Sequence, residues 1–130
     1  MDMRRFVVEM GTGIDQHGQD DTVAAARAVT DAIRRVCLTG LGEIVRLSSP
    51  GDMVVEVQVA VPHPERVRRE EVLAALPLGK AKLDVVTGGM LARVLMSRDL
   101  GDKTDEAIIA NAAVTVLVDM DKAREAWKQA

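Results

Sequence analysis

The stretch Gly11-Thr12-Gly13-Ile14-Asp15-Gln16-His17-Gly18 separates a short strand pattern from the longest helical pattern in the chain. It holds three glycines, a carboxylate and an imidazole within eight residues. Glycine has a high entropic cost on folding and buries no side chain, so a loop that only joined two elements would not need three of them. The sequence therefore predicts a loop over residues 11–18 that binds or grips something.

The segments on either side of this loop predict a strand and a helix. Alternating apolar residues over 4–10 indicate a strand with one apolar face, formed by Phe6, Val8 and Met10. After the loop, capping residues at 19–22 precede apolar positions at helical spacing, which continue until Thr39-Gly40 stops the pattern. Cys37 falls on the apolar side of this helix, and we expect its thiol to be buried and inert.

The rest of the chain predicts an α+β domain. A hairpin is expected to join strands at 43–48 and 53–61 through a turn that contains Pro50 and Gly51. The other predicted elements are a helix at 67–76, a strand at 80–87, a strand at 107–119 and a helix at 122–129. Residues 90–104 fit a strand, a short helix or a loop. This order predicts one domain over residues 1–130, with a mixed or antiparallel sheet and helices packed on one face.

The composition excludes several partners. The chain has 130 residues, 48% of them hydrophobic, and a formal net charge of -3. Nucleic-acid binding favours a basic patch and aromatic stacking, whereas Phe6 and Trp127 are the only aromatic residues here. Without a transmembrane run or a signal-peptide pattern, we expect a cytoplasmic protein with no membrane partner. Because the apolar content exceeds what one thin helical layer covers, we expect a homo-oligomer, with a trimer among the arrangements.

The chemistry of the loop leaves two interpretations open. A phosphate-binding loop is disfavoured, because Gln16 stands where the third glycine of a dinucleotide fingerprint belongs. Asp15 and His17 are two residues apart, so in an extended segment they share one face and could ligate a divalent metal such as zinc. A third ligand would have to come from His63, Asp20 or Asp21. The alternative, which we favour on the residues alone, is that Asp15 caps the turn and His17 is a hydrogen-bonded loop histidine.

Other residues outside the loop are weaker candidates for function. His63 lies between two prolines and could act as an acid or base. Asn111 interrupts an apolar series, and we expect a buried, hydrogen-bonded amide with a structural role. Gly88-Gly89 is interpreted as a plain turn or bulge, with a second binding loop as the alternative.

The pattern GxGxDxHG in residues 11–18 resembles the hallmark of a small family of conserved hypothetical proteins, found in bacteria and in longer plant proteins, with no assigned function. The resemblance spans most of the chain. It implies that the loop is a site and says nothing about the reaction.

The first third of the chain also resembles 2-C-methylerythritol cyclodiphosphate synthase, a trimeric zinc enzyme whose first strand ends in a GxGxDxH loop. That resemblance implies metal-ligand roles for Asp15 and His17. In that enzyme a further histidine ligand precedes a Thr-Asp-Ala triplet, which is Thr30-Asp31-Ala32 here, but Arg27 occupies the histidine position. Arginine cannot ligate a metal, so the substitution disfavours a zinc site of that kind. Arg27 and His17 could instead bind a carboxylate or a phosphate.

The leading hypothesis is a small-molecule enzyme with its site on this loop. Asp15 and His17 would be paired metal ligands, or a general base with its orienting partner. The predicted ligand-binding residues are Gly11, Gly13, Gly18 and Arg27. The alternative hypothesis is a non-catalytic, homo-oligomeric binding or scaffold protein in which the motif loop is structural.

Overall fold

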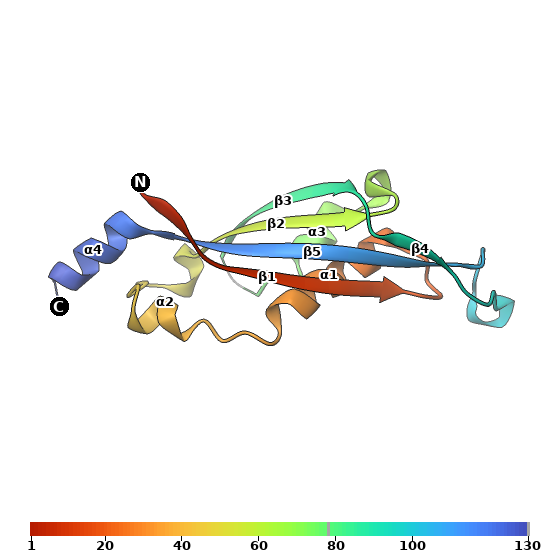
Figure 1. Ribbon diagram of the computed structural model, residues 1–130, viewed down its shortest axis with the longest axis horizontal. Helices are drawn as coiled ribbons and strands as arrows, with labels where there is room; N and C mark the ends of the chain where they lie inside the picture. Colours follow the sequence, from red (N-terminus) through yellow and green to blue (C-terminus); the bar gives the residue numbers. More distant parts are fainter. Residues whose placement is uncertain (78, 130) are drawn as a thin grey trace.

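Two long strands at the centre of the structure organise the fold. In the computed structural model, which describes residues 1–77 and 79–129, β1 (Met3–Asp15) pairs antiparallel with β5 (Glu106–Asp119) over nearly its whole length. β2 (Val54–Val61) lies antiparallel on the other side of β5, and β3 (Lys80–Thr87) lies parallel to β2. The short β4 (Met90–Arg93) pairs with the start of β5. The result is a mixed five-stranded sheet, as Figure 1 shows. Four strands follow the order β1-β5-β2-β3, and β4 pairs with β5 outside this order.

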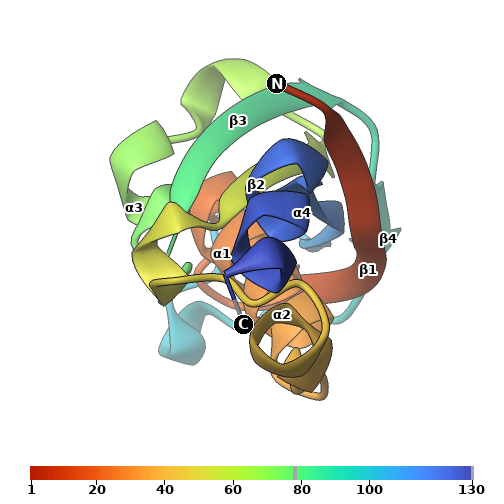
Figure 2. The same cartoon turned by 90° about the vertical axis from the view of Figure 1, so that its left-hand side faces the viewer.

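The helices complete an α+β domain, which confirms the predicted fold class. Helix α1 (Asp21–Ile33) contacts β1, β5 and β2, and α3 (Arg69–Leu73) contacts α1 and β3. They cover one face of the curved sheet, as the view along the molecule in Figure 2 shows. The helix α4 (Met120–Lys128) projects beyond the sheet at the end where the chain begins. No helix of residues 1–77 and 79–129 is long and apolar enough to cross a membrane.

The first half of the motif lies in a strand, which corrects the prediction of a loop over 11–18. Strand β1 continues to Asp15 because its ladder with β5 is unbroken from Val7 to the pair Asp15 and Ile108. Continuous pairing with a central strand outweighs the weak strand preference of glycine. Only residues 16–18 of the motif form the bend after β1.

Gly11 and Gly13 are required by the packing of α1 on β1. A Cβ atom on either glycine would lie less than 3.0 Å from backbone atoms of α1. The helix presents Ala24, Ala28 and Ala32 to the same strand, and all three are buried. The helix and the strand therefore approach each other backbone to backbone, which only small residues on both sides permit.

The predicted apolar face of β1 is not part of the core. A register shift between Arg5 and Val7 precedes the alternation that places Glu9, Gly13 and Asp15 beneath α1. Val8 and Met10 consequently lie on the opposite face and are exposed. Alternation in a sequence shows that two faces differ but not which of them a helix covers.

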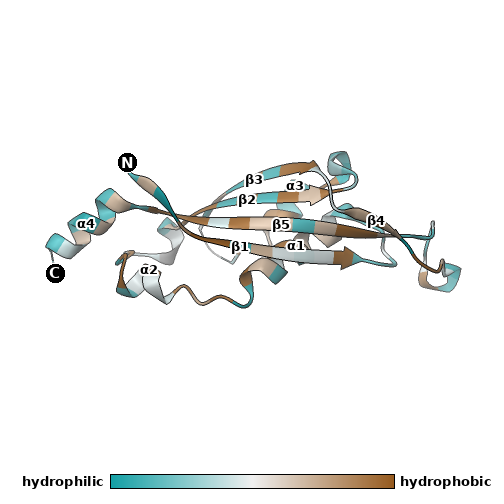
Figure 3. Cartoon of the chain, in the orientation of Figure 1, coloured by the Kyte–Doolittle hydropathy of each residue, from teal (hydrophilic) through white to brown (hydrophobic). Residues whose placement is uncertain are grey.

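We call this uncovered side of the sheet the open face. It is formed by the side chains that alternate with the buried ones along the paired strands, whose hydropathy along the chain Figure 3 shows. Its residues are Val8, Met10, Thr12 and Ile14 of β1, Ile109, Asn111, Ala113 and Thr115 of β5, Glu56, Gln58 and Ala60 of β2, Lys82, Asp84 and Val86 of β3, and Met90 of β4. Asn111 is exposed on it, which corrects the expectation of a buried amide, and accepts a hydrogen bond from the Thr12 hydroxyl at 3.4 Å.

The hairpin predicted between residues 43–48 and 53–61 is wrong. The first of these segments begins at the end of the helix α2 (Thr39–Glu43) and continues as a turn, and β2 pairs with β5 and β3 instead. Leu41 and Val45 are four residues apart and both are buried in a second apolar cluster with Val116. Packing of Leu41 and Val45 against Val116 therefore goes with the end of α2 and a turn in place of the expected strand.

The first helix is shorter than predicted. α1 ends at Ile33, and Thr39-Gly40 lies at the start of α2 instead of stopping the first helix. Cys37 therefore falls in the connection between the two helices and is exposed, which corrects the expectation of a buried thiol.

The terminal helix was predicted and is confirmed as α4. It begins with Asp119, whose carboxylate accepts a hydrogen bond from the Asp121 N–H at 3.0 Å. Trp127 attaches the helix to the body of the protein, because its indole N–H donates to the Ile44 carbonyl at 2.6 Å. The Arg46 guanidinium also stacks 3.7 Å from the centre of the same ring.

Candidate functional site

Asp15 closes the bend that follows β1. Its carboxylate accepts the backbone N–H of Gly18 at 3.2 Å and that of Asp20 at 3.0 Å. A Cβ atom on Gly18 would lie 2.6 Å from the same carboxylate, so a larger residue there would displace the Asp15 side chain. These contacts match the turn-capping interpretation of Asp15.

His17 is oriented by Asp102 and not by Asp15. The His17 Nδ1 atom lies 2.9 Å from Asp102 Oδ1 and 3.1 Å from Oδ2. The Asp102 side chain is fully buried and also accepts the Ser97 N–H at 2.8 Å. The Ser97 hydrogen bond, followed by the one from His17, lowers the pKa of Asp102 against the opposing effect of burial. The structure thus contains the predicted histidine with a carboxylate partner that the sequence did not reveal.

Gln19 connects the bend after β1 to the loop that contains Asp102. Its amide nitrogen donates to the Thr104 carbonyl at 3.0 Å, and its amide oxygen accepts the Lys103 N–H at 3.1 Å. Gln19 adopts a left-handed backbone conformation, with φ of 52°. Because the amide binds backbone groups of the facing loop, the loop around Asp102 is held over the bend at residues 16–18.

A second histidine and aspartate pair lies at the start of α1. The buried Asp21 accepts the His63 backbone N–H at 2.9 Å and lies 3.1 Å from the His63 Nδ1 atom. His63 follows β2 in the chain, as His17 follows β1. Since β1 and β2 both run antiparallel to β5, they end at the same end of the sheet, on the right in Figure 1. The two histidines follow these strand ends.

The two imidazoles have the same arrangement. Each ring binds a buried carboxylate through Nδ1, and the side chains remain 36% exposed for His17 and 28% for His63. Among the described residues, neither Nε2 atom takes a hydrogen bond from the protein. Each ring therefore has one nitrogen fixed by the protein and one available to another molecule.

Arg27 covers the outer edge of β1. Its Nη1 atom donates to the Ile14 carbonyl at 2.6 Å and lies 3.5 Å from Asp15 Oδ1. Asp31, one helical turn further along α1, accepts the Thr12 N–H at 3.0 Å. These bonds satisfy backbone groups that point away from the sheet, so Arg27 has a structural role whether or not it also binds a ligand.

Residues 1–77 and 79–129 contain no group of three or more His, Cys, Asp or Glu side chains arranged to hold a metal ion. Asp15 and His17, the two predicted ligands, are engaged with different partners. The predicted approach of a ligand to Gly11 and Gly13 also meets an obstacle, because α1 fills the face on which their Cβ positions lie.

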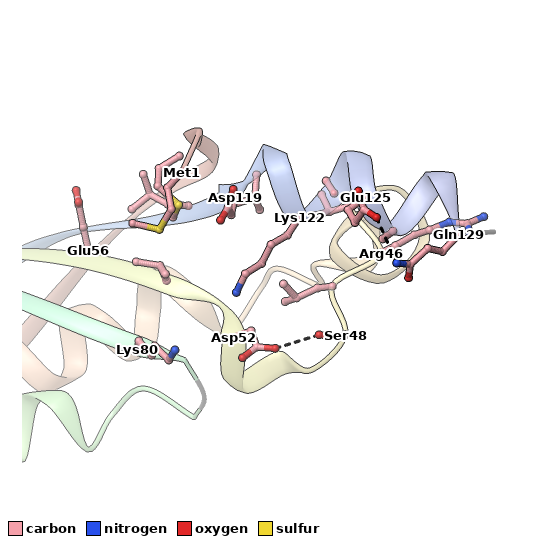
Figure 4. Close-up of a pocket in the computed structure, with 18 of the residues that line it drawn as sticks. Met1, Arg46, Ser48, Asp52, Glu56, Lys80, Asp119, Lys122, Glu125 and Gln129 are labelled. Atoms are coloured by element: carbon pink, nitrogen blue, oxygen red, sulfur yellow. Dashed lines mark hydrogen bonds between the residues drawn. The ribbon is translucent and has the colours of Figure 1, made fainter.

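Two cavities lie away from His17. One, of about 500 Å³, lies at the other end of the sheet, where Lys122 of α4 points towards Lys80 and Asp52 in Figure 4. The other is a hollow of about 490 Å³, lined mainly by open-face residues that include Met10 and Asn111. His17 lines neither of them.

The depressed pKa of Asp102 predicts how stability depends on pH. Because the pKa is lower in the folded chain than its ordinary value of 3.8, the ionised carboxylate stabilises the fold above pH 3.8, and this contribution is lost as the pH falls through the lower folded value. We expect Asp102→Asn to remove this part of the acid dependence. Urea midpoints measured between pH 2 and pH 6 would show a smaller acid loss for Asp102→Asn than for wild type; equal losses would contradict the assignment.

Comparison with known proteins places the chain in a family. The family described as conserved hypothetical protein (Lin0512_fam) matches residues 5–116, and the chain belongs to it. A crystal structure of an FtsZ-like protein of unknown function from Nostoc punctiforme is similar, with 54% sequence identity and a TM-score of 0.85. The similarity covers 92% of this chain and 98% of that chain. No curated protein matches.

Proposed function

We propose that this member of the Lin0512 family is a cytoplasmic small-molecule enzyme in which His17 is the general base. The observation that carries the proposal is the hydrogen bond from a partly exposed imidazole to a fully buried carboxylate. A buried carboxylate bonded to Nδ1 favours the tautomer with its proton on that nitrogen. Nε2 then has a lone pair directed away from Asp102.

Each member of the site has a distinct task in this proposal. Nε2 of His17 takes a proton from the substrate, and Asp102 stabilises the imidazolium that forms. Ser97, through its N–H bond to the carboxylate, keeps Asp102 ionised and in place. The imidazolium returns the proton to the product, so the enzyme regains its initial state.

We extend the proposal to a substrate that carries a carboxylate or a phosphate. The Arg27 side chain is 59% exposed, and only Nη1 is used to bind the Ile14 carbonyl. Its remaining N–H groups can donate to an anion in the paired geometry that guanidinium favours. The neighbouring Asp15 carboxylate lies 3.5 Å from the same Nη1 atom, which leaves Nε and Nη2 for the anion.

A ligand-capture experiment tests this function. Untagged protein is incubated with a small-molecule extract of bacterial cells, separated by ultrafiltration and analysed by mass spectrometry. We expect a compound that wild type retains and His17→Ala loses roughly 2- to 10-fold, because a hydrogen bond to the neutral imidazole contributes about 0.5–1.5 kcal/mol. His63→Ala is the matched control and should retain the compound. Identical retention by wild type and His17→Ala would overturn the proposal.

The scaffold hypothesis is the second candidate, and one observation favours it. Gly11, Gly13, Gly18 and Asp15 all have packing or turn-forming contacts within the chain. If the motif is only structural, His17→Ala should lower the melting temperature or the oligomer mass. If the site belongs to an enzyme, His17→Ala should lose the ligand and keep the melting temperature and the oligomer mass.

A divalent metal such as zinc at Asp15 and His17 stays a prediction, which elemental mass spectrometry of wild type and His17→Ala tests.

A further inference from the structure

We propose that the open face is the surface on which a second copy of this chain binds. Large apolar side chains lie uncovered along it, with Met10 78% and Met90 59% exposed, and with Val8 and Ile14 also exposed. They come from β1 and β4, on both sides of β5. An apolar surface that continues across neighbouring strands is typical of an interface.

The chain exposes more surface than a compact monomer of its mass. A compact folded monomer of 14.0 kDa is expected to expose about 6,700 Å². This chain exposes 7966 Å², which is about 1,300 Å² more. A standard interface buries roughly 800 Å² on each partner, so the excess is large enough for one stable contact.

The open face has an apolar side on β1 and β4 and a polar side on β2 and β3. The β2 and β3 side of the face carries charges of both signs, with Glu56 directly opposite Lys82 and Asp84 further along β3. Near the apolar part, the Thr12 hydroxyl and Asn111 are hydrogen-bonded to each other. Covering this pair therefore leaves the Thr12 hydroxyl with an acceptor.

The edge of β1 indicates that the partner binds by its face and does not extend the sheet there. An unpaired edge strand offers free backbone groups to another strand. On β1, however, Asp31 binds the Thr12 N–H and Arg27 binds the Ile14 carbonyl. These two groups are occupied by α1, so this part of β1 does not accept a further strand, and the proposed contact is made through the side chains of the open face.

The partner copy would also close the hollow in the open face. Met10, Thr12, Gln58 and Asn111 are among the residues that line it, at a volume of about 490 Å³. The proposal is independent of His17, which does not belong to the open face. A failed ligand-capture experiment would therefore leave it intact.

Sedimentation velocity with Met10→Lys tests the interface. At 50 µM, we expect wild type to have two or three times the 14.0 kDa mass of one chain. A lysine at the centre of an apolar contact should weaken association roughly 100-fold, so that Met10→Lys sediments as a monomer. Leu95→Lys is the matched control, because Leu95 is 87% exposed but lies in the loop after β4; this variant should keep the wild-type mass.

Far-UV circular dichroism verifies that each variant is folded. If Met10→Lys fails to fold, Met90→Lys makes the same test from another strand. A wild-type protein of 14.0 kDa at this concentration would overturn the proposal. So would a folded Met10→Lys protein that keeps the wild-type mass, which would place the interface on another surface.

Discussion

Gly13→Ala lowers the free energy of unfolding by about 3 kcal/mol, at the upper end of the usual cost of overpacking. The added methyl group would lie less than 3.0 Å from backbone atoms of Ala24, Arg27 and Ala28. A helix backbone cannot rotate away as a side chain can, so α1 must move off β1 and lose contacts along its length. Urea denaturation followed by circular dichroism measures the change.

Gly42→Ala is the control for this substitution. Gly42 lies in α2, and apart from its chain neighbours and the backbone of its own helix no atom lies within 4 Å of the position that its Cβ would occupy. Alanine favours a helix over glycine by roughly 0.5–1 kcal/mol, so Gly42→Ala should be neutral or slightly stabilising. Equal effects of the two substitutions would show that α1 does not pack on Gly13 as described.

Asp21→Ala destabilises the fold by about 2 kcal/mol, because the removed carboxylate leaves a backbone N–H without its acceptor. Asp21 is almost fully buried and accepts both the His63 N–H and a hydrogen bond at the His63 ring. Asp21→Asn keeps one acceptor oxygen and should recover part of the loss. Chemical denaturation at pH 7 gives all three free energies.

Asp121→Ala provides the matched surface control. Asp121 also lies in the first turn of a helix, but its side chain is 59% exposed in its ion pair with Arg124. Exposed ion pairs contribute roughly 0–1 kcal/mol. If Asp21→Ala costs no more than Asp121→Ala, the His63 pair has no role in holding β2 to α1.

The fold could be predicted from the sequence where local patterns are long. The strand at residues 53–61, the strand at 107–119 and the terminal helix all form close to their predicted bounds. The strand expected at residues 43–48 does not form, because an apolar pattern this short does not separate a strand from the helix end and turn that these residues adopt. The core was predicted on the wrong face of β1, because Gly11 and Gly13, which pack against α1, are not hydrophobic.

The candidate site could be predicted only in part. The motif singled out His17, but Asp102 is 85 residues away in a segment without a clear pattern. Pairs of this kind assemble in space and leave no fixed spacing in a sequence. Asp15 is near His17 in the chain, but backbone groups in the bend occupy its oxygens.

The contact between Gly11, Gly13 and the alanines of α1 fixes the position of the helix along β1. Movement by a single residue along a helix corresponds to about 1.5 Å of travel and 100° of rotation. Either would bring a larger side chain against the strand, so α1 has one permitted setting on β1. That setting places Asp21 against His63 and Asp31 against Thr12 at the same time. The two glycines, which have hydrogen atoms in place of side chains, therefore determine the positions of both of these contacts.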